Sequence, residues 1–311
     1  MQNRKIVVTG AAGLVGQNLL ARLKSKGITD IVAIDKHPTN CEVLRRFHPD
    51  IEILNVDLAV YDGWQECLKD CRALVVGHAQ IGGIFPEEFI KNNVRATERL
   101  LEAAVQQNVP YLVNISSSVV NSMAVDNYTE TKKAQEALVA ATGIKQVILR
   151  PTLMFGWFDR KHLGWLARFM KRTPIFPVPG NGQFLRQPLY EGDFCDVIVS
   201  AIENEITGTY NITGQERVDY IDLIRMVKEA TGANAHIQKI PYRLFWIMLK
   251  VNSWFDRNPP FTTGQLEALV TPDVFEVIDW PGIFGVRATP LREALQITFR
   301  DPLYSEITLD F

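Results

Sequence analysis

A tyrosine and a lysine four residues apart are the side chains in this sequence best suited to carry a reaction. They belong to the segment Tyr128-Thr129-Glu130-Thr131-Lys132, in a stretch whose pattern predicts a helix over residues 127–142. Residues at i and i+4 share one face of a helix, so the phenol and the ammonium are expected to be neighbours. A lysine cation favours the phenolate of a tyrosine whose free pKa is about 10, which brings it toward use as a proton acceptor. The alternative is that Tyr128 and Lys132 are an ordinary pair of side chains on the protein surface, without a role in a reaction.

Serine hydroxyls follow the predicted strand that precedes this helix. The segment Val113-Asn114-Ile115-Ser116-Ser117-Ser118 ends a strand predicted over residues 110–116. The carboxyl ends of parallel strands line the ligand crevice of an open sheet, so these hydroxyls are expected beside Tyr128 and Lys132. That placement argues against a surface pair.

Three glycines near the amino terminus have the spacing of a dinucleotide phosphate site. They lie in Val7-Val8-Thr9-Gly10-Ala11-Ala12-Gly13-Leu14-Val15-Gly16, between an apolar strand and a helix predicted over residues 14–26. Gly10 permits the turn, Gly13 lets backbone N–H groups approach the phosphates, and Gly16 lets the helix pack closely on the sheet. The phosphates are expected at the positive end of that helix. Ala12, Leu14 and Val15 are also expected to contact the cofactor.

An acidic residue follows the second predicted strand. Ile31-Val32-Ala33-Ile34 ends in Asp35, whose carboxylate can accept hydrogen bonds from the adenosine ribose and would repel a 2′-phosphate, which favours NAD over NADP. An alternative is that Asp35 only opens a turn before Pro38. Nearby cations could instead neutralise a 2′-phosphate, namely Lys36, His37, Arg45 and Arg46.

The elements that must position these groups alternate along the chain. Alternation of strands and helices predicts an α/β fold, a Rossmann-like doubly wound parallel sheet. Strands are predicted over residues 5–9, 31–35, 51–56, 73–77, 110–116, 145–150 and 209–213, and helices over 14–26, 62–69, 87–107, 127–142 and 192–204.

Proline and glycine become frequent after residue 150 and indicate a second unit. We expect residues 1–150, with a returning segment at about 188–214, to form an NAD-binding domain. Residues 151–187 and 215–311 are expected to form a smaller substrate-binding lobe. The apolar stretch at 244–255 could line an apolar pocket, or form the core of that lobe.

Composition fits a water-soluble enzyme. The net charge of −2 and the scattered cations give no basic stripe for nucleic acid, and 47% hydrophobic residues suffice for a core. Four cysteines without C-x-x-C spacing suggest reduced thiols and a cytoplasmic location. No signal peptide or membrane span is expected, and we expect a homodimer.

Taken in order, these motifs resemble those of the extended short-chain dehydrogenase/reductase superfamily, specifically its NAD-dependent epimerase/dehydratase group. The resemblance covers nearly the whole chain. Besides the motifs above it rests on Asp57-Leu58, Gly77-His78-Ala79-Gln80, Asn93-Val94, Leu149-Arg150-Pro151, and the G-x-G-x-x-x-R segment Gly180–Arg186.

The resemblance implies roles for individual residues. Tyr128 would exchange a proton with a substrate hydroxyl or ketone, Lys132 would tune it and hold the nicotinamide ribose, and Ser117, with Ser118 as the alternative, would bond the substrate oxygen. Hydride would pass between the nicotinamide and the substrate carbon. Further cofactor contacts would come from Lys36, Asp57, Leu58, Gly77, His78, Ala79, Asn93, Ile115 and Pro151, and substrate contacts from Gln80, Ser118 and Arg186.

Departures from the family pattern narrow the reaction. Sugar 4,6-dehydratases carry an acidic pair where this chain has Ser118 and Val119, which favours oxidation, reduction or epimerisation over dehydration. Nucleotide-sugar enzymes commonly have asparagine at Leu153, yet Arg186 is suited to grip a substrate diphosphate.

Three functions therefore stay open. The first is an NAD-dependent oxidoreductase or epimerase acting on a nucleotide sugar. The second is an enzyme resembling 3β-hydroxysteroid dehydrogenases that acts on an apolar alcohol. The third is a cofactor-binding accessory subunit without turnover, which would have no need for Ser117, Tyr128 and Lys132.

Overall fold

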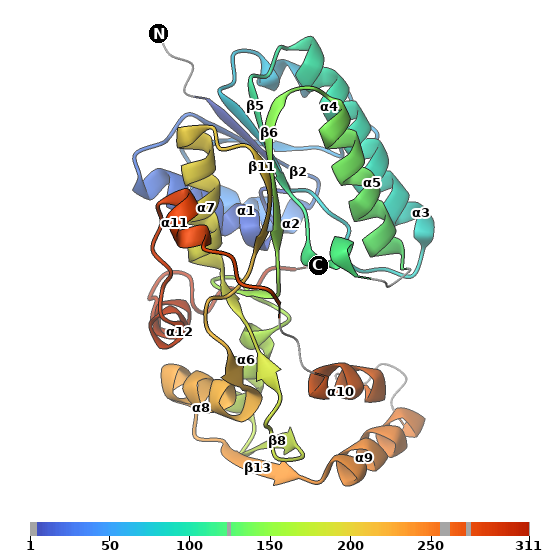
Figure 1. Cartoon of the computed structure of the whole chain (residues 1–311), viewed down its shortest axis with the longest axis vertical. Coiled ribbons are helices and arrows are strands. Elements are labelled where there is room, and N and C mark those ends of the chain that lie inside the picture. Colours follow the sequence, from blue (N-terminus) through green and yellow to red (C-terminus); the bar gives the residue numbers. More distant parts are fainter. Residues whose placement is uncertain (1–4, 123–125, 256–261, 272–274, 311) are drawn as a thin grey trace.

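Seven parallel strands form the central sheet, in the order β11-β6-β5-β4-β1-β2-β3 (Figure 1). The computed structural model of the chain describes residues 5–122, 126–255, 262–271 and 275–310. The order reverses between β1 and β4, and this confirms the predicted doubly wound Rossmann-like fold. The strands are β1 (Ile6–Thr9), β2 (Ile31–Asp35), β3 (Glu52–Asn55), β4 (Ala73–Val76), β5 (Tyr111–Ile115), β6 (Lys145–Pro151) and β11 (Gly208–Ile212).

Helices cover both faces of the sheet because its central strands are apolar on both sides. Every residue of β1, β4 and β5 is buried, as expected where parallel strands lie between two helix layers. One face carries α1 (Leu14–Ser25), α2 (Pro38–Phe47), α7 (Glu191–Asn204) and α11 (Trp280–Phe284). The other face carries α3 (Pro86–Phe89), the π-helical turn η2 (Ile90–Arg95), α4 (Ala96–Gln106) and α5 (Asn127–Ala141), with short 3-10 turns η1 (Gln65–Leu68) and η3 (Ser118–Asn121) nearby.

A second lobe lies beyond the carboxyl ends of the strands (Figure 1) and has an apolar core of its own. That core joins α6 (Leu163–Arg172), α8 (Tyr220–Thr231) and α12 (Leu291–Arg300) around β8 (Ile175–Pro179). The remaining elements are β7 (Met154–Phe155), β9 (Leu185–Arg186), β10 (Leu189–Tyr190), β12 (Val218–Asp219), β13 (His236–Ile240), α9 (Tyr242–Phe255) and α10 (Thr263–Val270). The domain boundaries near residues 150, 188 and 214 stay our proposal.

One segment expected in the lobe packs on the sheet domain instead. Trp280 and Phe284 of α11 belong to the apolar cluster of α1 and α7. The Trp280 indole donates to the Thr213 carbonyl at 2.8 Å. These large side chains are better buried against α7 than left on an irregular lobe, which explains the return of the chain.

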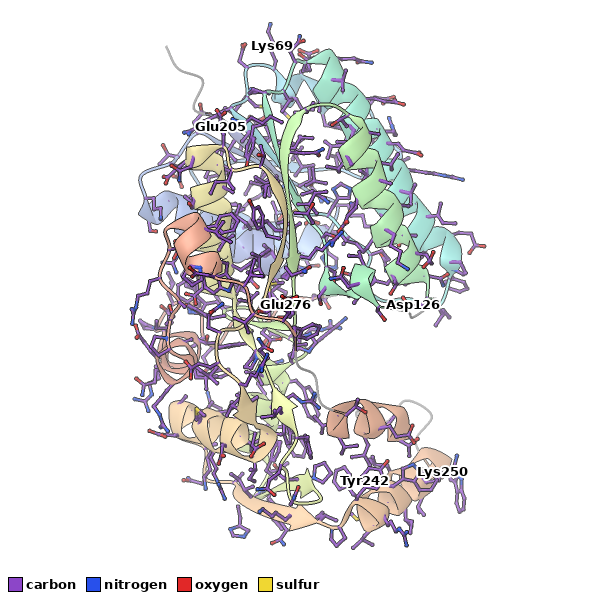
Figure 2. The ribbon with its side chains drawn as sticks, viewed as in Figure 1. Lys69, Asp126, Glu205, Tyr242, Lys250 and Glu276 are labelled. Carbon is purple, nitrogen blue, oxygen red and sulfur yellow. The ribbon has the colours of Figure 1, made fainter. Side chains whose placement is uncertain are left out.

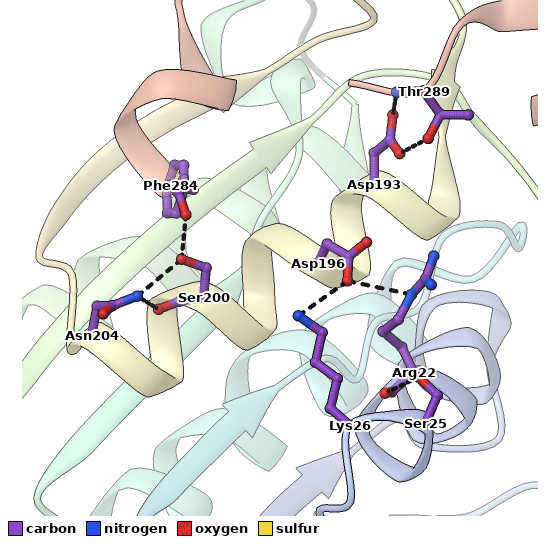
Figure 3. A network of polar contacts seen from close by, with 9 residues as sticks. All are labelled: Arg22, Ser25, Lys26, Asp193, Asp196, Ser200, Asn204, Phe284 and Thr289. Atoms are coloured by element: carbon purple, nitrogen blue, oxygen red, sulfur yellow. Dashed lines mark hydrogen bonds and ion pairs between the residues drawn. The ribbon is translucent and has the colours of Figure 1, made fainter. Parts of the chain in front are cut away.

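Polar contacts tie α7 to both of its neighbours (Figure 3). Asp196 pairs with Arg22 at 3.4 Å and with Lys26 at 3.6 Å, so α7 is fixed to α1. Asp193 accepts hydrogen bonds from the backbone and hydroxyl of Thr289 at 2.8 and 2.6 Å, and Ser200 donates to the carbonyl of Phe284. The segment that follows α11 is thereby held on the sheet domain.

Two local predictions were wrong. The helix predicted over residues 62–69 is only the 3-10 turn η1, because Gly63 adopts a positive φ of 94° and interrupts the segment. Helix α2 was not predicted; of its four apolar residues after Pro38, only Cys41 and Leu44 are buried. It begins at Pro38, which suits a first helical turn, and the ring of His37 accepts the N–H of Asn40 at 3.4 Å.

Within the ranges that the structure describes, no helix combines the length and the apolar character needed to cross a membrane.

A buried carboxyl group at the start of α7 provides a test of this packing. Glu191 is fully buried, one carboxyl oxygen accepts the Cys195 thiol at 3.8 Å, and the other oxygen has no partner among the described residues. A Cβ on Gly156 would lie 2.5 Å from the Cβ of Glu191, so the side chain is tightly enclosed. Burial, together with the nearby Asp159, raises the pKa of Glu191 to about 8.

The wild-type protein is expected to lose folding stability as the pH rises, and Glu191→Gln is expected to abolish the part of this pH dependence that comes from Glu191. Between its ordinary pKa of 4.5 and about 8, Glu191 keeps a proton in the folded state that the unfolded chain releases. Folding stability therefore falls with rising pH in this window, by at most about 1.4 kcal/mol per pH unit from this group. Denaturant titrations at pH 5 and 8.5 measure the difference, with Glu102→Gln on the exposed face of α4 as the control. Equal pH dependence in wild type and Glu191→Gln would contradict the assignment.

Candidate active site

The ends of β1 and β4 approach each other so closely that no side chain fits between them. Gly10 has a φ of +66°, and a Cβ there would lie 2.6 Å from the carbonyl carbon of Gly77. Gly77 in turn would place a Cβ 2.7 Å from the Thr9 carbonyl oxygen, and its N–H donates to the Thr9 hydroxyl at 3.2 Å. Both positions need glycine, which agrees with the predicted turn at Gly10.

The loop from Gly10 to Gly16 fits a dinucleotide pyrophosphate. Within the described chain no side chain caps the first N–H groups of α1, and its first turn holds no acidic residue. Such a helix end attracts an anion through its N–H groups and its dipole. Gly16 packs against Ala11, where a Cβ would come within 2.4 Å of the carbonyl oxygen, so α1 is drawn close to the loop. Ala12, Gly13, Leu14 and Val15 form the edge of this cradle.

Asp35 ends β2 and is bonded to the glycine loop. One carboxylate oxygen accepts the N–H of Ala12 at 2.9 Å and the other accepts the N–H of His37 at 2.9 Å. Burial raises its pKa, although these bonds and the neighbouring Lys36 and His37 act in the opposite direction. The side chain therefore fixes the turn and presents its carboxylate beside the cradle.

The cations near Asp35 have protein partners. Lys36 donates to the Asn92 side chain at 2.8 Å, and Arg45 pairs with Glu42 at 2.6 Å. The guanidinium of Arg46 lies 5.5 Å from the centre of the Phe47 ring.

Ser117 and Tyr128 meet at the carboxyl end of β5. A hydrogen bond joins their side chains, and the Ser117 hydroxyl also accepts the N–H of Val119 at 3.4 Å. Ser118 begins η3, and Ser116 is buried with its hydroxyl unpartnered among the described residues. Ser117 is thus the serine that the structure brings to the phenol.

Helix α5 begins at a capping aspartate. Asp126 accepts the N–H and the hydroxyl of Thr129 at 2.9 and 2.8 Å. Figure 2 shows Asp126 at the end of α5 that faces the second lobe. The cap therefore sets the start of the helix that carries Tyr128 and Lys132.

Lys132 is buried and points back toward the sheet. Its ammonium donates to the Ile115 carbonyl at 2.8 Å and to the side-chain oxygen of Gln135. Burial lowers the pKa of Lys132 to about 7, while Glu136 acts weakly in the other direction. We expected Lys132 to lower the pKa of Tyr128, but burial raises it, and the bond from Ser117 only partly offsets this. The hydrogen bonds that the structure shows for the Lys132 ammonium go to Ile115 and Gln135.

A buried polar network, missed from the sequence, runs from Lys132 to the glycine loop. Gln135 donates to the Thr97 hydroxyl at 2.8 Å, and Thr97 contacts the ring Nε2 of His78 at 3.0 Å. The other ring nitrogen of His78 contacts the Thr9 hydroxyl at 2.8 Å, and burial lowers its pKa to about 3. Both ring nitrogens of His78 are used within the protein, and its contact with the cofactor stays a prediction. A polar residue three positions after Lys132 was the available signal for Gln135.

Asn93, for which the cofactor contact stays a prediction, has a positioning role within the protein. It is fully buried, its side-chain oxygen accepts the N–H of Gln80 at 2.6 Å, and its NH₂ donates to the Gln80 carbonyl at 3.1 Å and the Thr131 hydroxyl at 2.9 Å. The side-chain oxygen of Gln80 accepts Asn92 at 3.0 Å. Asn93 thereby ties the segment after β4 to α5.

The other expected cofactor residues lie along the same edge of the sheet. Burial alone would raise the pKa of Asp57, but its 2.8 Å pair with Lys91 and the Ala59 N–H give a net lowering. Leu58 is buried beside it, Ala79 is exposed after Gly77, Ile115 ends β5 and Pro151 ends β6.

Arg186, expected to contact the substrate, lies in the second lobe. It is 8% exposed and donates to the Thr271 carbonyl at 3.0 Å. Its guanidinium lies 5.7 Å from the centre of the Phe184 ring. The Arg186 guanidinium is therefore held within the lobe by backbone and aromatic contacts.

Comparisons with known proteins agree with this geometry. A solved structure of UDP-glucuronic acid 4-epimerase from Bacillus cereus, in complex with NAD, superposes with a TM-score of 0.73 at 22% identity, over 95% of this chain and 96% of that one. At this identity the likeness establishes the fold.

Two curated relatives are distant enzymes of different substrates. dTDP-4-dehydrorhamnose reductase of Aggregatibacter actinomycetemcomitans is 22% identical over 262 residues, 76% of this chain and 82% of that one. Ceramide reductase of Caulobacter vibrioides is 22% identical over 243 residues, 76% of this chain and 73% of that one. The model of the NAD-dependent epimerase/dehydratase family matches residues 6–213, from the first strand of the sheet to the end of the last. The chain belongs to the NAD-dependent epimerase/dehydratase family.

Proposed function

We propose that this protein is an NAD-dependent oxidoreductase or epimerase that acts on a hydroxyl or ketone carbon of a nucleotide sugar. The observation that carries the proposal is the hydrogen bond between Ser117 and Tyr128 at the carboxyl end of β5, on the same edge of the sheet as the glycine loop, with Lys132 one helical turn further along α5. A protein that only stored a cofactor would gain nothing from this set of side chains.

Each member of the set has a distinct role. NAD, when bound, supplies the carbon that takes up or returns a hydride. Tyr128 takes the proton from the substrate hydroxyl, or gives it to the ketone, while the Ser117 hydroxyl donates a hydrogen bond to the same oxygen. Lys132, which is held by the Ile115 carbonyl and Gln135, would bind the nicotinamide ribose. Backbone N–H groups at Gly13–Val15 would hold the pyrophosphate.

Dehydration does not fit the groups around Tyr128. Expulsion of water needs an acid near the leaving hydroxyl, and the turn after Ser117 consists of Ser118, Val119, Val120 and Asn121. Asp126 is the carboxylate that acts on Tyr128, and it caps α5. We therefore propose oxidation, reduction or epimerisation.

The cofactor preference rests on Asp35. Its carboxylate ends β2 beside the cradle, whereas Lys36, Arg45 and Arg46 are engaged by Asn92, Glu42 and Phe47. The 2′-phosphate of NADP would therefore lie close to the Asp35 carboxylate, and these three cations already have partners in the protein.

The substrate class rests on the relatives and on Arg186. A nucleotide-sugar epimerase and a dTDP-sugar reductase are among the similar proteins. A second candidate, an apolar alcohol, is favoured by Leu153, which is exposed where the resemblance leads us to expect asparagine, and by the partners that already hold Arg186. Ceramide reductase, another relative, is named for a lipid substrate.

Asp35→Asn is expected to narrow the preference for NAD⁺ over NADP⁺ by about tenfold, because the charge facing the extra phosphate is lost while an acceptor for Ala12 remains. Calorimetric titration of both cofactors measures the ratio of their dissociation constants. Asp30→Asn, an exposed charge at the other end of the same strand, is the matched control. Tighter binding of NADP⁺ to the wild-type protein would overturn the assignment.

Tyr128→Phe is expected to lower kcat by roughly 10²–10⁴-fold while leaving the affinity for NAD⁺ nearly unchanged, since only the exchangeable proton is lost. The assay incubates protein and NAD(H) with a panel of nucleotide sugars and apolar secondary alcohols, and follows the absorbance of the reduced cofactor and the product mass. Tyr210→Phe, which removes a phenol bonded to the Thr207 carbonyl, is the control. Wild-type rates for Tyr128→Phe would refute the mechanism.

Arg186→Ala distinguishes the two substrate classes. A nucleotide sugar should lose a charge-assisted contact of about 1.5–3 kcal/mol, seen as a KM raised by roughly 10- to 100-fold, and uridine diphosphate should inhibit the wild type competitively. An apolar alcohol should show neither effect. Arg225→Ala, an exposed cation of the same lobe, controls for the loss of charge, and melting temperatures verify that the lobe stays folded. Unchanged kinetics with every nucleotide sugar would exclude that class.

A further inference from the structure

An ion pair between β6 and α5 lies beside the proposed site, and the proposed mechanism does not use it. The Arg150 guanidinium of β6 donates two bonds to the Glu136 carboxylate of α5, Nε to Oε1 at 2.9 Å and Nη2 to Oε2 at 2.5 Å. At 24% and 12% exposure, these side chains are the least exposed base and the least exposed acid among the ion pairs of the described residues. A bidentate pair with so little access to solvent has a defined geometry and is weakly screened.

The same guanidinium also holds the turn that follows Ser117. Its Nη1 donates to the side-chain oxygen of Asn121 at 3.2 Å, and Asn121 is the last residue of η3. That turn begins directly after Ser117, whose hydroxyl accepts the N–H of Val119 at 3.4 Å. Arg150 is therefore bonded at the same time to the turn after Ser117 and to the helix that carries Tyr128.

The sheet fixes the level at which Arg150 lies. Leu149, the residue before it, pairs with Ile115 at the end of β5, and Arg150 itself pairs with Asn211 of β11. The side-chain oxygen of Asn211 accepts the NH₂ group of Asn121 at 3.0 Å. The turn is thus tied to two neighbouring strands at the carboxyl edge of the sheet, and such strands hold a site more precisely than a loop does.

Glu136 adds an electrostatic link to Lys132. It follows Lys132 by four residues in α5, so it lies one helical turn further along the same face. Its negative charge favours the Lys132 ammonium, in opposition to burial, which lowers the pKa of Lys132 to about 7. Two other titratable groups near Lys132 stay neutral, because burial lowers the pKa of His78 to about 3 and raises the pKa of Tyr128. The charge beside Lys132 therefore depends on Glu136 and on the cation that pairs with it.

We propose that Arg150 is a positioning residue for the reaction at the carboxyl end of β5. It locks the turn after Ser117 to α5, the helix that carries Tyr128 and Lys132. It also holds Glu136 one helical turn from Lys132. This inference rests on the proposed function, since the acid/base chemistry gives the relative placement of the turn and the helix its consequence.

A simple staple between β6 and α5 is the competing interpretation. Such a staple would support folding alone, so the loss of either member of the ion pair would lower stability without a specific effect on Lys132. The positioning role differs in two measurable ways. The bond to Asn121 should matter for turnover, and the two members of the ion pair should shift the titration of Lys132 in opposite directions.

Turnover measures the effect on the turn. Arg150→Gln should lower kcat by roughly 10- to 100-fold, because a Ser117 hydroxyl displaced from Tyr128 loses its alignment with the substrate oxygen. Asn121→Ala frees the turn but keeps the ion pair, and it should lower kcat by about fivefold. Calorimetric titration should show little change in the affinity for NAD⁺, since neither substitution touches the glycine loop or Asp35.

Nuclear magnetic resonance of protein with isotope-labelled lysine measures the titration of Lys132 itself, whose signal is assigned by its absence from Lys132→Met. Glu136→Gln should lower the pKa of Lys132, because a negative charge beside the ammonium is lost. Arg150→Gln should raise it, because Glu136 then keeps its charge without the cation that pairs with it. Asn121→Ala should leave it unchanged. This measurement needs no substrate.

Lys145→Gln is the matched control. Lys145 is the first residue of β6 and pairs with Glu205 at 2.6 Å, so the variant removes an ion pair at the other end of the same strand. It should leave kcat and the titration of Lys132 as in the wild type. Melting temperatures verify that every variant is folded.

Two results would overturn the proposal. One is a wild-type kcat in both Arg150→Gln and Asn121→Ala, and the other is a titration of Lys132 that shifts in the same direction, or not at all, in Arg150→Gln and Glu136→Gln. Absence of turnover in the wild type contradicts the proposed function instead, and the titrations then decide the link between Arg150 and Lys132 by themselves.

Discussion

The close approach of Gly10 to Gly77 is the constraint on which the site depends. These glycines end β1 and β4, the two strands between which the order of the sheet reverses, and a side chain on either would overlap the backbone of the other strand end. The same loop leads into α1, whose first N–H groups have no side-chain cap among the described residues, and the Ala12 N–H of the loop is bonded to Asp35. The proposed anion site therefore depends on this close approach.

The same contact explains why the interior beside it is polar. Thr9, His78, Thr97 and Gln135 form a chain of hydrogen bonds from the glycine loop to Lys132. Thr9, Thr97 and Gln135 are fully buried, His78 is half-buried, and all have partners within the chain, so the network resists distortion more than a set of exposed contacts would. Lys132 is placed by the strand end and by this network together, and the cofactor loop and the acid/base helix are thereby coupled in position.

Sequence patterns predicted the fold, and they indicated the residues that the structure brings together after β1 and β5, because those features repeat or have tight steric demands. Alternating strands and helices, three glycines and the i, i+4 spacing of Tyr128 and Lys132 each have one simple geometric meaning. The hydrogen bonds of His78 and Asn93 within the protein were not predicted, because a polar residue beside a crevice can face either the ligand or the protein, and only the packing of α4 and α5 decides. Gln135 was missed for the same reason, and α2 was missed because charged and polar residues separate its few apolar ones.

The separation of the molecule into two apolar cores explains how α9 can keep an exposed apolar face, although we expected residues 244–255 to line a pocket or to fill the core of the lobe. That face consists of Leu244, Ile247, Met248, Val251 and Trp254. The sheet is stabilised by the clusters on its two faces, and the lobe by the cluster around α6, α8 and α12. Neither core includes the outer face of α9, so the side chains on that face are not needed to fill either core. The acid/base chemistry proposed near the sheet and the exposed face of α9 can therefore vary independently of each other.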